Sequence, residues 1–400
     1  MNKPKIRFKG FEGEWKERKF GDFGHVEMCK RIFKYQTSSQ GEIPFYKIGT
    51  FGFQPDAFIS RSLYEDYRKK FSYPKKGDIL ISAAGTIGRT IEYKGEECYY
   101  QDSNIVWLNH NEEIDNAYLK QLYSLVTWSS LEGATIKRLY NSNILNTHFN
   151  LPSLPEQRAL ASYFTSLDAQ IAASTSRLSS LKQIKAASLL NMFPQKGETV
   201  PRVRFKGFQG EWKEVKLSSI AIFSKGQGYS KSDLRENGHP IILYGRMYTK
   251  YQFAINEVDT FSNLKGAYVL SEGNEIIMPA SGETPEDIAC ASAVLAKGII
   301  LGGDLNIVRF DLKKYSTPFL ALTITYSKTH YDLSKCAQGK SVVHLHNEAI
   351  SKTAVSIPSL PEQRAIASYF TALDAQITLH RERLEKLKQI KAACLERMFA

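Results

Sequence analysis

Residues 152–193 read PSLPEQRALASYFTSLDAQIAASTSRLSSLKQIKAASLLNMF, and residues 358–399 read PSLPEQRAIASYFTALDAQITLHRERLEKLKQIKAACLERMF. About 30 of these 42 aligned positions are identical, at a constant offset of 206. A shorter pair also repeats, because IRFKGFEGEWKERK (Ile6 to Lys19) returns as VRFKGFQGEWKEVK (Val203 to Lys216). The stretches between the repeats have largely diverged. A duplicated frame with two different inserts predicts one framework that presents two different surfaces.

Each copy of the longer repeat has the pattern of one long helix. Pro155 suits the first helical turn, where its missing N–H is no loss, and Glu156 complements the positive end of the helix. Apolar residues then recur in steps of four and three, which is the a/d seam of a coiled coil. A helix of this size is about 57 Å long at roughly 1.5 Å per residue. The seam positions are Leu160, Phe164, Leu167, Ile171, Leu178, Leu181 and Ile184 in the first copy, and Ile366, Phe370, Leu373, Ile377, Leu384, Leu387 and Ile390 in the second.

Each seam is interrupted once, at Ser174 and at His380. Polar seam residues often fix the register of a coiled coil, although these two positions also fit a solvated edge. Two equal helices with matching seams can pack against each other within one chain. We expect an antiparallel pair with pseudo-twofold symmetry; a parallel pair and pairing between chains are the alternatives.

Composition and charge limit the class of protein. The chain is 42% hydrophobic with a net charge of +12, which suits ordinary cores and a polyanionic partner, although a basic protein without such a partner fits equally well. No apolar run approaches the roughly 18 residues of a membrane span, and the charged start MNKPKIRFKG does not resemble a signal peptide. Five scattered cysteines without CxxC spacing fit a reducing cytoplasm and predict neither disulfides nor a zinc site.

The inserts, residues 20–150 and 217–356, have a mixed α/β pattern. Short apolar runs lie between Gly, Pro and Asn residues and predict strands. The expected strands are Ile43–Ile48, Asp78–Ser82 and Asn104–Leu108 in the first insert, and Pro240–Tyr244, Glu275–Met278 and Asn306–Phe310 in the second. Weak kinship survives between the inserts: GDILISAAGTIGR (77–89) resembles GNEIIMPASGETPED (273–287), QDSNIVW (101–107) resembles GDLNIVR (303–309), and KRLYNSNI (137–144) resembles VHLHNEAI (343–350).

In both inserts a strand leads into a loop of small residues. Such residues let a backbone approach a ligand closely, and hydroxyl and N–H groups can hold phosphate oxygens, while basic side chains reach phosphates or guanine edges. Taken singly, each charged residue is also explained as a solvated surface group. The candidate DNA-binding residues are Lys47, Ser82, Gly85, Thr86, Arg89, Lys137, Arg138 and Tyr140 in the first insert, and Arg246, Ser281, Gly282, Thr284, Lys340, His344 and His346 in the second.

The GEWKE segments that open each half are too polar for a core strand. Their aromatic residues instead predict anchors that pin each insert to a neighbouring surface. These are Phe8, Phe11 and Trp15 in the first half, and Phe205, Phe208 and Trp212 in the second.

Motifs for catalysis are missing from the sequence. His344 and His346 share one strand face but lack a third metal ligand. Gly226-Gln227-Gly228 faintly resembles a methyl-donor loop, yet no Asn-Pro-Pro or Asp-Pro-Pro motif accompanies it. We therefore predict that the chain is not an enzyme, and that it holds neither metal nor cofactor itself.

The duplicated PSLPEQ-led helices, the GEWKE segments and the GDILIS-type strand resemble the specificity subunit of a type I restriction-modification system. The resemblance covers essentially the whole chain and implies an α+β protein with two target recognition domains, residues 1–151 and 195–357. It also implies two spacer helices, residues 152–194 and 358–400, which separate the two readers of a bipartite double-stranded DNA site. No base-reading residue carries over by motif.

The same resemblance implies the partners and the location. Two methyltransferase subunits would dock on the helices and use S-adenosylmethionine, and two restriction-translocase subunits, where present, would use ATP and Mg in the cytoplasm. A fused enzyme and a protein-only adaptor are the alternatives. Turnover by the purified chain would indicate the first, and the lack of salt-dependent DNA binding would indicate the second.

Overall fold

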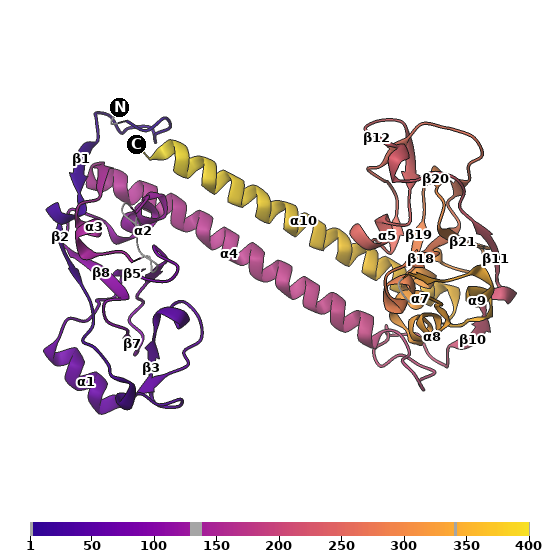
Figure 1. Ribbon diagram of the computed structural model, residues 1–400, viewed down its shortest axis with the longest axis horizontal. Helices are drawn as coiled ribbons and strands as arrows, with labels where there is room; N and C mark the ends of the chain where they lie inside the picture. Colours follow the sequence, from indigo (N-terminus) through magenta and orange to yellow (C-terminus); the bar gives the residue numbers. More distant parts are fainter. Residues whose placement is uncertain (1–2, 129–137, 340–341, 400) are drawn as a thin grey trace. The chain divides into compact units, whose positions relative to one another are not determined.

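The computed structural model describes residues 3–128, 138–339 and 342–399 (Figure 1). Two compact units make up the chain: unit 1 is Met1–Thr175 with Glu382–Ala400, and unit 2 is Ser176–Arg381. Both divisions fall inside a long helix, so each unit contains half of α4 (Leu154–Asn191) and half of α10 (Leu360–Met398). The domain boundaries expected from the sequence stay predictions.

The repeated segments enclose each insert in the same way. In unit 1, β1 (Lys16–Lys19) pairs antiparallel with β9 (His148–Leu151), the strand that leads into α4. In unit 2, β10 (Lys213–Lys216) pairs antiparallel with β23 (Ala354–Ile357), which leads into α10. The start and the end of each insert are thus joined beside the start of a long helix.

Besides the β1–β9 pair, the described residues of unit 1 form two larger sheets. An antiparallel sheet has the order β2 (Gly24–Glu27), β8 (Ile105–His110), β5 (Ile79–Ser82) and β6 (Thr90–Glu92). A smaller sheet has the order β4 (Phe58–Ile59), β3 (Ile43–Tyr46) and β7 (Tyr99–Tyr100). The helices of the insert are α1 (Arg61–Lys70), α2 (Asn116–Leu125) and α3 (Asn141–Leu145), with 3-10 turns η1 (Phe20–Asp22), η2 (Lys34–Gln36) and η3 (Ile48–Thr50).

Unit 2 elaborates this plan. Its first sheet has the order β11 (Ala221–Lys225), β21 (Leu305–Phe310), β17 (Glu275–Pro279), β19 (Ser292–Val294) and β14 (Ala254–Ile255). Its second has the order β12 (Leu234–Arg235), β15 (Phe261–Ser262), β13 (His239–Ile242), β20 (Lys297–Leu301) and β16 (Leu270–Glu272), and β18 (Ser281–Gly282) pairs with β22 (Val343–His344). The shorter helices are α5 (Arg246–Thr249), α6 (Pro285–Ile288), α7 (Thr317–Tyr326), α8 (Lys328–Cys336) and α9 (Asn347–Lys352), with 3-10 turns η4 (Leu217–Ser219) and η5 (Lys231–Asp233).

All six strands expected from the sequence form, and no start or end differs from the expected one by more than two residues. One match between the inserts was wrong by two residues. Aligning the small-residue loops, SAAGT (82–86) with PASGE (279–283), places Leu80 at the position of Ile277. In the sheets, Leu80 pairs with Trp107, whereas Ile277 pairs with Ile307. The structure therefore aligns Trp107 with Ile307, while the shared letters NIV align Trp107 with Arg309. A shift of two residues keeps the same side chains facing the core, so the sequence pattern alone does not reveal it.

The long helices pack antiparallel, as expected. In unit 1, Asp168 pairs with Lys391 at 2.5 Å and the Tyr163 hydroxyl lies 3.3 Å from the Cys394 sulfur. Residue numbers therefore increase along one helix in the direction in which they decrease along the other, as in an antiparallel pair. The equivalent contacts in unit 2 join Lys185 to Asp374 at 2.5 Å and the Ser188 and Tyr369 hydroxyls at 2.8 Å. The two ion pairs are formed by equivalent residues of the two repeats, which are 206 positions apart: Asp374 is equivalent to Asp168, and Lys391 to Lys185. Each helix thus supplies the aspartate to one pair and the lysine to the other.

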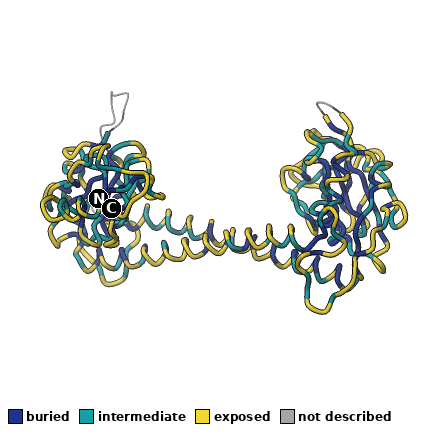
Figure 2. The backbone as a smooth tube through the Cα atoms, turned by 90° about the horizontal axis from the view of Figure 1, so that it is seen from below, coloured by how far each residue is buried: buried dark blue, intermediate teal, exposed yellow. Residues whose placement is uncertain are grey.

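The seam residues alternate with exposed positions along both helices (Figure 2). Phe164 and Phe370 have no exposed surface and belong to the cores of unit 1 and unit 2. Ser174 is buried, whereas Ile184 is 45% exposed and lies outside the seam. The remaining buried seam residues are Leu160, Leu167, Leu178, Leu181, Ile366, Leu373, Ile377 and Leu384; Ile171, Leu387 and Ile390 are half-buried.

A buried ion pair fixes the start of each long helix. Arg7 binds both carboxylate oxygens of Glu156, at 2.6 and 2.7 Å, and donates to the carbonyls of Glu12 and Gly13. The Glu156 side chain is 2% exposed. In unit 2, Arg204 binds Glu362 in the same bidentate way at 2.7 Å and donates to the carbonyls of Gln209 and Gly210. The repeated PEQ and RFKGF motifs thus meet, although the sequence analysis related Glu156 only to the helix end.

The aromatic anchors contact the helices. Trp15 lies edge-on to Phe399 and Phe8 edge-on to Tyr163, with ring centroids 6.4 and 5.8 Å apart. In unit 2, the Trp212 and Phe193 rings and the Phe205 and Tyr369 rings make the same contacts at 6.3 and 5.7 Å. Phe11 and Phe208 are half-buried. Each GEWKE tryptophan therefore packs against the phenylalanine that follows the far end of the other half's helix.

Replacing Arg7 by Met should destabilise unit 1 by about 3–5 kcal/mol, because it leaves the buried Glu156 carboxylate without its cation. The double variant Arg7→Met/Glu156→Gln should regain most of this loss, since it removes the buried charge. Urea unfolding of the full chain measures both. Arg204→Met is the matched variant in unit 2 and should have a similar effect there. An Arg7→Met protein with wild-type stability would contradict the role given to this ion pair.

Candidate nucleic-acid interface

The turn Gln101–Asn104 connects four segments of unit 1. It joins β7 to β8, and Ser103 at its centre has a positive φ of 53°. Its hydrogen bonds reach every segment that contains a predicted site residue of this unit. They are Ile48 N to Gln101 Oε1 (2.8 Å), Arg31 Nε to Asp102 Oδ2 (2.8 Å), Arg138 Nη2 to Ser103 O (3.0 Å) and Ala83 N to Asn104 O (2.7 Å). The loop after β5, the segment at Arg138 and the β2 and β3 loops are therefore brought together.

The loop that follows β5 is held by a buried serine. The Ser82 hydroxyl donates to the Thr86 carbonyl at 2.5 Å and accepts from the Arg89 N–H at 2.9 Å, so it shapes the loop from inside. Gly85 has φ +65°, a conformation that favours glycine, and it is exposed together with Thr86. Arg89 donates to the Phe51 carbonyl at 2.9 Å and lies 5.0 Å above the Phe53 ring.

The other candidates of unit 1 differ in their availability to a ligand. Leu139 N donates to the Ala83 carbonyl at 2.8 Å, which places Arg138 and Tyr140 beside the loop. Tyr140 is 61% exposed, and Arg138 is half-buried. Lys47 forms an ion pair with Asp56 at 2.9 Å. Lys137 lies outside the described residues.

Unit 2 repeats this backbone arrangement with different side chains. Leu345 N donates to the Ala280 carbonyl at 3.1 Å, as Leu139 does to Ala83, and β18 and β22 take the place of the bridge between Ala84 and Arg138. The Ser281 hydroxyl lies 3.3 Å from His344 Nδ1, and the rings of His344 and His346 are parallel, with centroids 6.3 Å apart. The pairs at matching positions are Thr86 and Glu283, Arg138 and His344, and Tyr140 and His346; all of these residues are exposed except Arg138, which is half-buried.

Three candidates of unit 2 are engaged within the protein. Arg246 pairs with Asp259 at 2.5 Å and donates to Gln252 at 3.0 Å, and its side chain is 8% exposed. Thr284 caps α6 by accepting from the Asp287 N–H at 3.1 Å. A Cβ on Gly282 would meet the Tyr248 hydroxyl at 2.8 Å, so this glycine makes room for a tyrosine. Lys340 lies outside the described residues.

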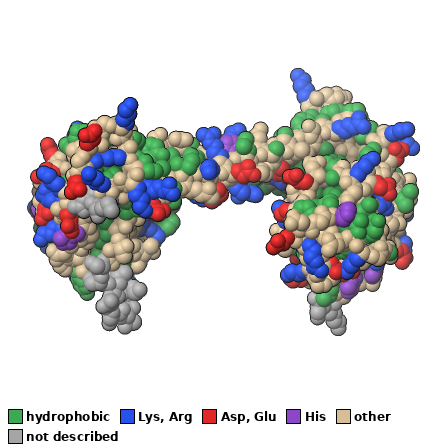
Figure 3. Space-filling view, turned by 90° about the horizontal axis from the view of Figure 1, so that it is seen from above, with side chains coloured by type: hydrophobic (Ala, Val, Ile, Leu, Met, Phe, Trp, Pro, Cys, Tyr) green, Lys and Arg blue, Asp and Glu red, His purple; other side chains and the backbone are tan. Residues whose placement is uncertain are grey.

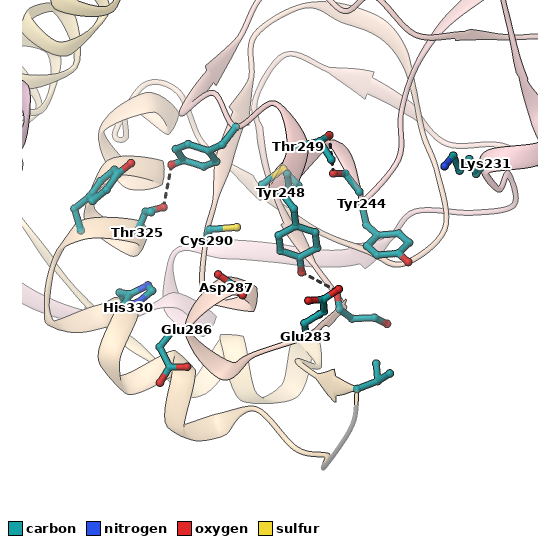
Figure 4. A pocket seen from close by; sticks show the side chains of 17 residues that line it. Lys231, Tyr244, Tyr248, Thr249, Glu283, Glu286, Asp287, Cys290, Thr325 and His330 are labelled. Carbon is teal, nitrogen blue, oxygen red and sulfur yellow. Dashed lines mark hydrogen bonds between the residues drawn. The ribbon is translucent and has the colours of Figure 1, made fainter. Parts of the chain in front are cut away.

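A hollow of about 1110 Å³ lies beside the Ser281–Glu283 segment (Figure 4). Three carboxylates, those of Glu283, Glu286 and Asp287, line it together with tyrosines, and Tyr248 donates to the Ser281 carbonyl at 2.7 Å. These charges repel phosphate. Cys290, also at its wall, is no nucleophile near neutral pH, because burial raises the pKa of its thiol to about 12.

Basic side chains in the β2–β3 connection escaped the sequence analysis. Arg31 bonds to the central turn of the interface, and its side chain is 60% exposed. The signal was the alternation of basic and aromatic residues in KRIFKY, residues 30–35. On the face that Figure 3 shows, Lys and Arg are interspersed with Asp and Glu over both units, so local clusters matter more than the net charge.

Among residues 3–128, 138–339 and 342–399, no three His, Cys, Asp or Glu side chains gather as they would around a metal ion. Within the same ranges, no helix has the length and apolar character needed to cross a membrane.

Comparison with known proteins gives consistent results. The family described as type I restriction modification DNA specificity domain matches residues 12–183 and 209–389. A putative type I restriction enzyme specificity subunit of Haemophilus influenzae is 56% identical over 143 residues, which are 36% of this chain and 37% of that protein. The match thus spans well under half of the length of that relative.

Two other proteins match over most of their length. The MjaVIII type I restriction enzyme specificity subunit of Methanocaldococcus jannaschii is 19% identical over 328 residues, 79% of this chain and 73% of that protein. The crystal structure of a type I restriction-modification S subunit from M. genitalium matches with a TM-score of 0.63 and 15% identity, covering 100% of this chain and 99% of that one. At this identity the structural match shows the fold alone.

Proposed function

Because this chain belongs to the family of type I restriction-modification specificity subunits, which are not catalytic, we propose that its two inserts each read one half of a bipartite DNA site. One observation carries the proposal. The two units build the same loop-and-bridge backbone and place different side chains on it, such as Arg138 against His344 and Tyr140 against His346. Different side chains at base edges read different bases, so the half-sites differ and the whole site is asymmetric.

The candidate residues divide into three groups under this proposal. Gly85, Thr86, Arg138, Tyr140, Ser281, His344 and His346 lie on the shared backbone arrangement and contact DNA directly. Ser82, Gly282 and Thr284 shape the loops that carry the contact residues. Lys47, Arg89 and Arg246 are cations that must exchange or share their present partners in order to reach a phosphate.

The long helices set the spacing between the half-sites. α4 has 38 residues and α10 has 39, so each is about 57 Å long at roughly 1.5 Å per residue. A rigid antiparallel pair fixes both the distance and the rotation between two readers. The half-site centres then lie about one DNA turn apart, roughly 34–36 Å, as for dimeric DNA readers.

Methyltransferase subunits dock on the helices and carry S-adenosylmethionine. Restriction-translocase subunits, where the system has them, carry ATP and Mg. This chain supplies only the recognition of the DNA sequence, and it acts in the cytoplasm, where the host DNA lies. The absence of a helical membrane span among the described residues and the mildly basic charge of +12 are compatible with this role.

Exchanging residues 20–150 for the matching insert of a family member with another site should change one half of the methylated sequence and leave the other half unchanged. The reason is that the framework contacts, Arg7 with Glu156 and Trp15 with Phe399, lie outside the exchanged segment. Methylome sequencing of cells that express the variant with its methyltransferase measures this. A change in both half-sites would contradict the modular arrangement.

Lengthening both helices by four residues, after Thr175 and after Arg381, should lengthen the spacer by one or two base pairs. The insertions lie between the ion pairs Asp168–Lys391 and Lys185–Asp374, so both pairs are kept. Four residues add roughly 6 Å of helix, and DNA rises about 3.4 Å per base pair.

The matched control inserts the same residues into α4 alone. The two ion pairs between the helices are then out of register with each other, so methylation should fall at every site. Methylome sequencing compares the two variants. An active double-insertion variant with the original spacer would show that the helices do not set the distance.

A further inference from the structure

The segment after β2 presents two large aromatic rings to solvent. Phe33 is 49% exposed and Tyr35 is 84% exposed, and their rings are stacked with centroids 5.8 Å apart and planes 8° apart. The backbone beneath them is ordered by hydrogen bonds. Phe33 N donates to the Gln36 side chain at 2.9 Å, and the Thr37 hydroxyl donates to the Lys34 carbonyl at 2.8 Å. A fixed turn that holds an exposed aromatic pair points to a binding partner rather than to core packing.

The charges around this pair select the chemistry of the partner. Residues 28–40, MCKRIFKYQTSSQ, contain three basic residues and no acidic one. Lys34, which lies between Phe33 and Tyr35 in the sequence, is exposed and forms no ion pair with any described residue. Alternating aromatic and basic side chains fit the stacked bases and phosphates of a nucleic acid.

The pair also belongs to the candidate interface of unit 1. Arg31, two residues before Phe33, bonds to Asp102 at 2.8 Å, and Ser103 N lies 3.2 Å from the Met28 sulfur. The turn Gln101–Asn104 therefore supports the aromatic pair as well as the loop after β5. A DNA helix bound at that loop would have the aromatic pair at its flank.

Unit 2 builds the same turn without the rings. Ser230 N donates to Asp233 at 2.7 Å, as Phe33 N does to Gln36, so Ser230 and Ser232 stand where unit 1 has Phe33 and Tyr35. Their hydroxyls bond to each other at 2.8 Å. Lys231 matches Lys34, but residues 225–237 contain two acidic residues, and Asp233 pairs with Lys265.

We propose that the Phe33–Tyr35 pair is an aromatic wedge with which unit 1 alone packs against the bases beside its half-site, while Lys34 and Arg31 hold the adjoining phosphates. This rests on the proposed function, in which unit 1 binds duplex DNA. Apolar wedges of this kind insert at a base step and bend the duplex, which favours flexible pyrimidine–purine steps. The wedge therefore adds affinity and a shape preference to one half-site and not to the other.

The test uses the full chain assembled with its methyltransferase subunits and a fluorescent duplex that contains the site found by methylome sequencing. Phe33→Ser/Tyr35→Ser, which installs the residues of unit 2, should weaken binding about 10–100-fold with the salt dependence unchanged, since base stacking is uncharged. Lys34→Ala should weaken binding and lower the slope of log K against log salt by about 0.9.

Matched variants separate a wedge from a general effect. Phe33→Tyr/Tyr35→Phe keeps both rings and should bind like the wild type, and Ser230→Ala/Ser232→Ala should also leave binding unchanged. On a duplex with the half-site of unit 1 scrambled, the wild type and Phe33→Ser/Tyr35→Ser should bind equally. Because Phe33 and Tyr35 are exposed, the thermal midpoint should stay the same.

Two outcomes would overturn the wedge and leave the proposed function standing. One is wild-type affinity of Phe33→Ser/Tyr35→Ser for the intact site. The other is unchanged DNA affinity with loss of a methyltransferase subunit, which would make the pair a protein contact. If the wild-type assembly itself shows no site-specific, salt-dependent binding, the proposed function fails and the wedge fails with it.

Discussion

The antiparallel packing of α4 against α10 is the interaction on which the rest of the structure depends. Each unit is completed by half of both helices: Phe164 of α4 and Met398 of α10 belong to one core, that of unit 1. Residues at the very end of the chain therefore close a core that begins with Trp15, whose ring contacts Phe399. Unit 1 is not a continuous segment, because Glu382–Ala400 completes it, whereas unit 2 (Ser176–Arg381) is continuous and holds the end of α4 and the start of α10.

This constraint accounts for what is repeated in the sequence and what is not. The repeated residues are those that contact the helices: Arg7 with Glu156, Arg204 with Glu362, and the tryptophans with the terminal phenylalanines. A buried bidentate pair tolerates no loss of one partner, because the other charge would stay buried alone. The inserts only have to keep the strands that enter and leave this frame, so their exposed side chains are free to differ.

Periodicity predicted the helices and strands well because it reflects which side faces the core. It could not predict partners far apart in the chain. The Arg7–Glu156 contact spans 149 positions, and nothing in the spacing of either motif indicates it. The same limit explains the two-residue misalignment of Trp107, since strand patterning repeats every two residues.

Residue type alone says less about the candidate site than periodicity says about the helices and strands, because the tertiary fold decides which charged side chains find a partner within the protein. Arg246 looked like a free cation and is occupied by Asp259, whereas Arg31 was overlooked and bonds to the central turn of the interface. Small-residue loops were located correctly, but Ser82 and Gly282 support those loops from inside. Tertiary context, not composition, decides which side chains remain available to a ligand.

Methylome sequencing of a host that expresses this unaltered chain with its methyltransferase tests the central claim most directly. The claim is that two different readers are held at a fixed separation by one helix pair. It predicts methylation at a single asymmetric site made of two unlike half-sites with a spacer of constant length. A palindromic site, one uninterrupted sequence or a spacer of variable length would contradict it.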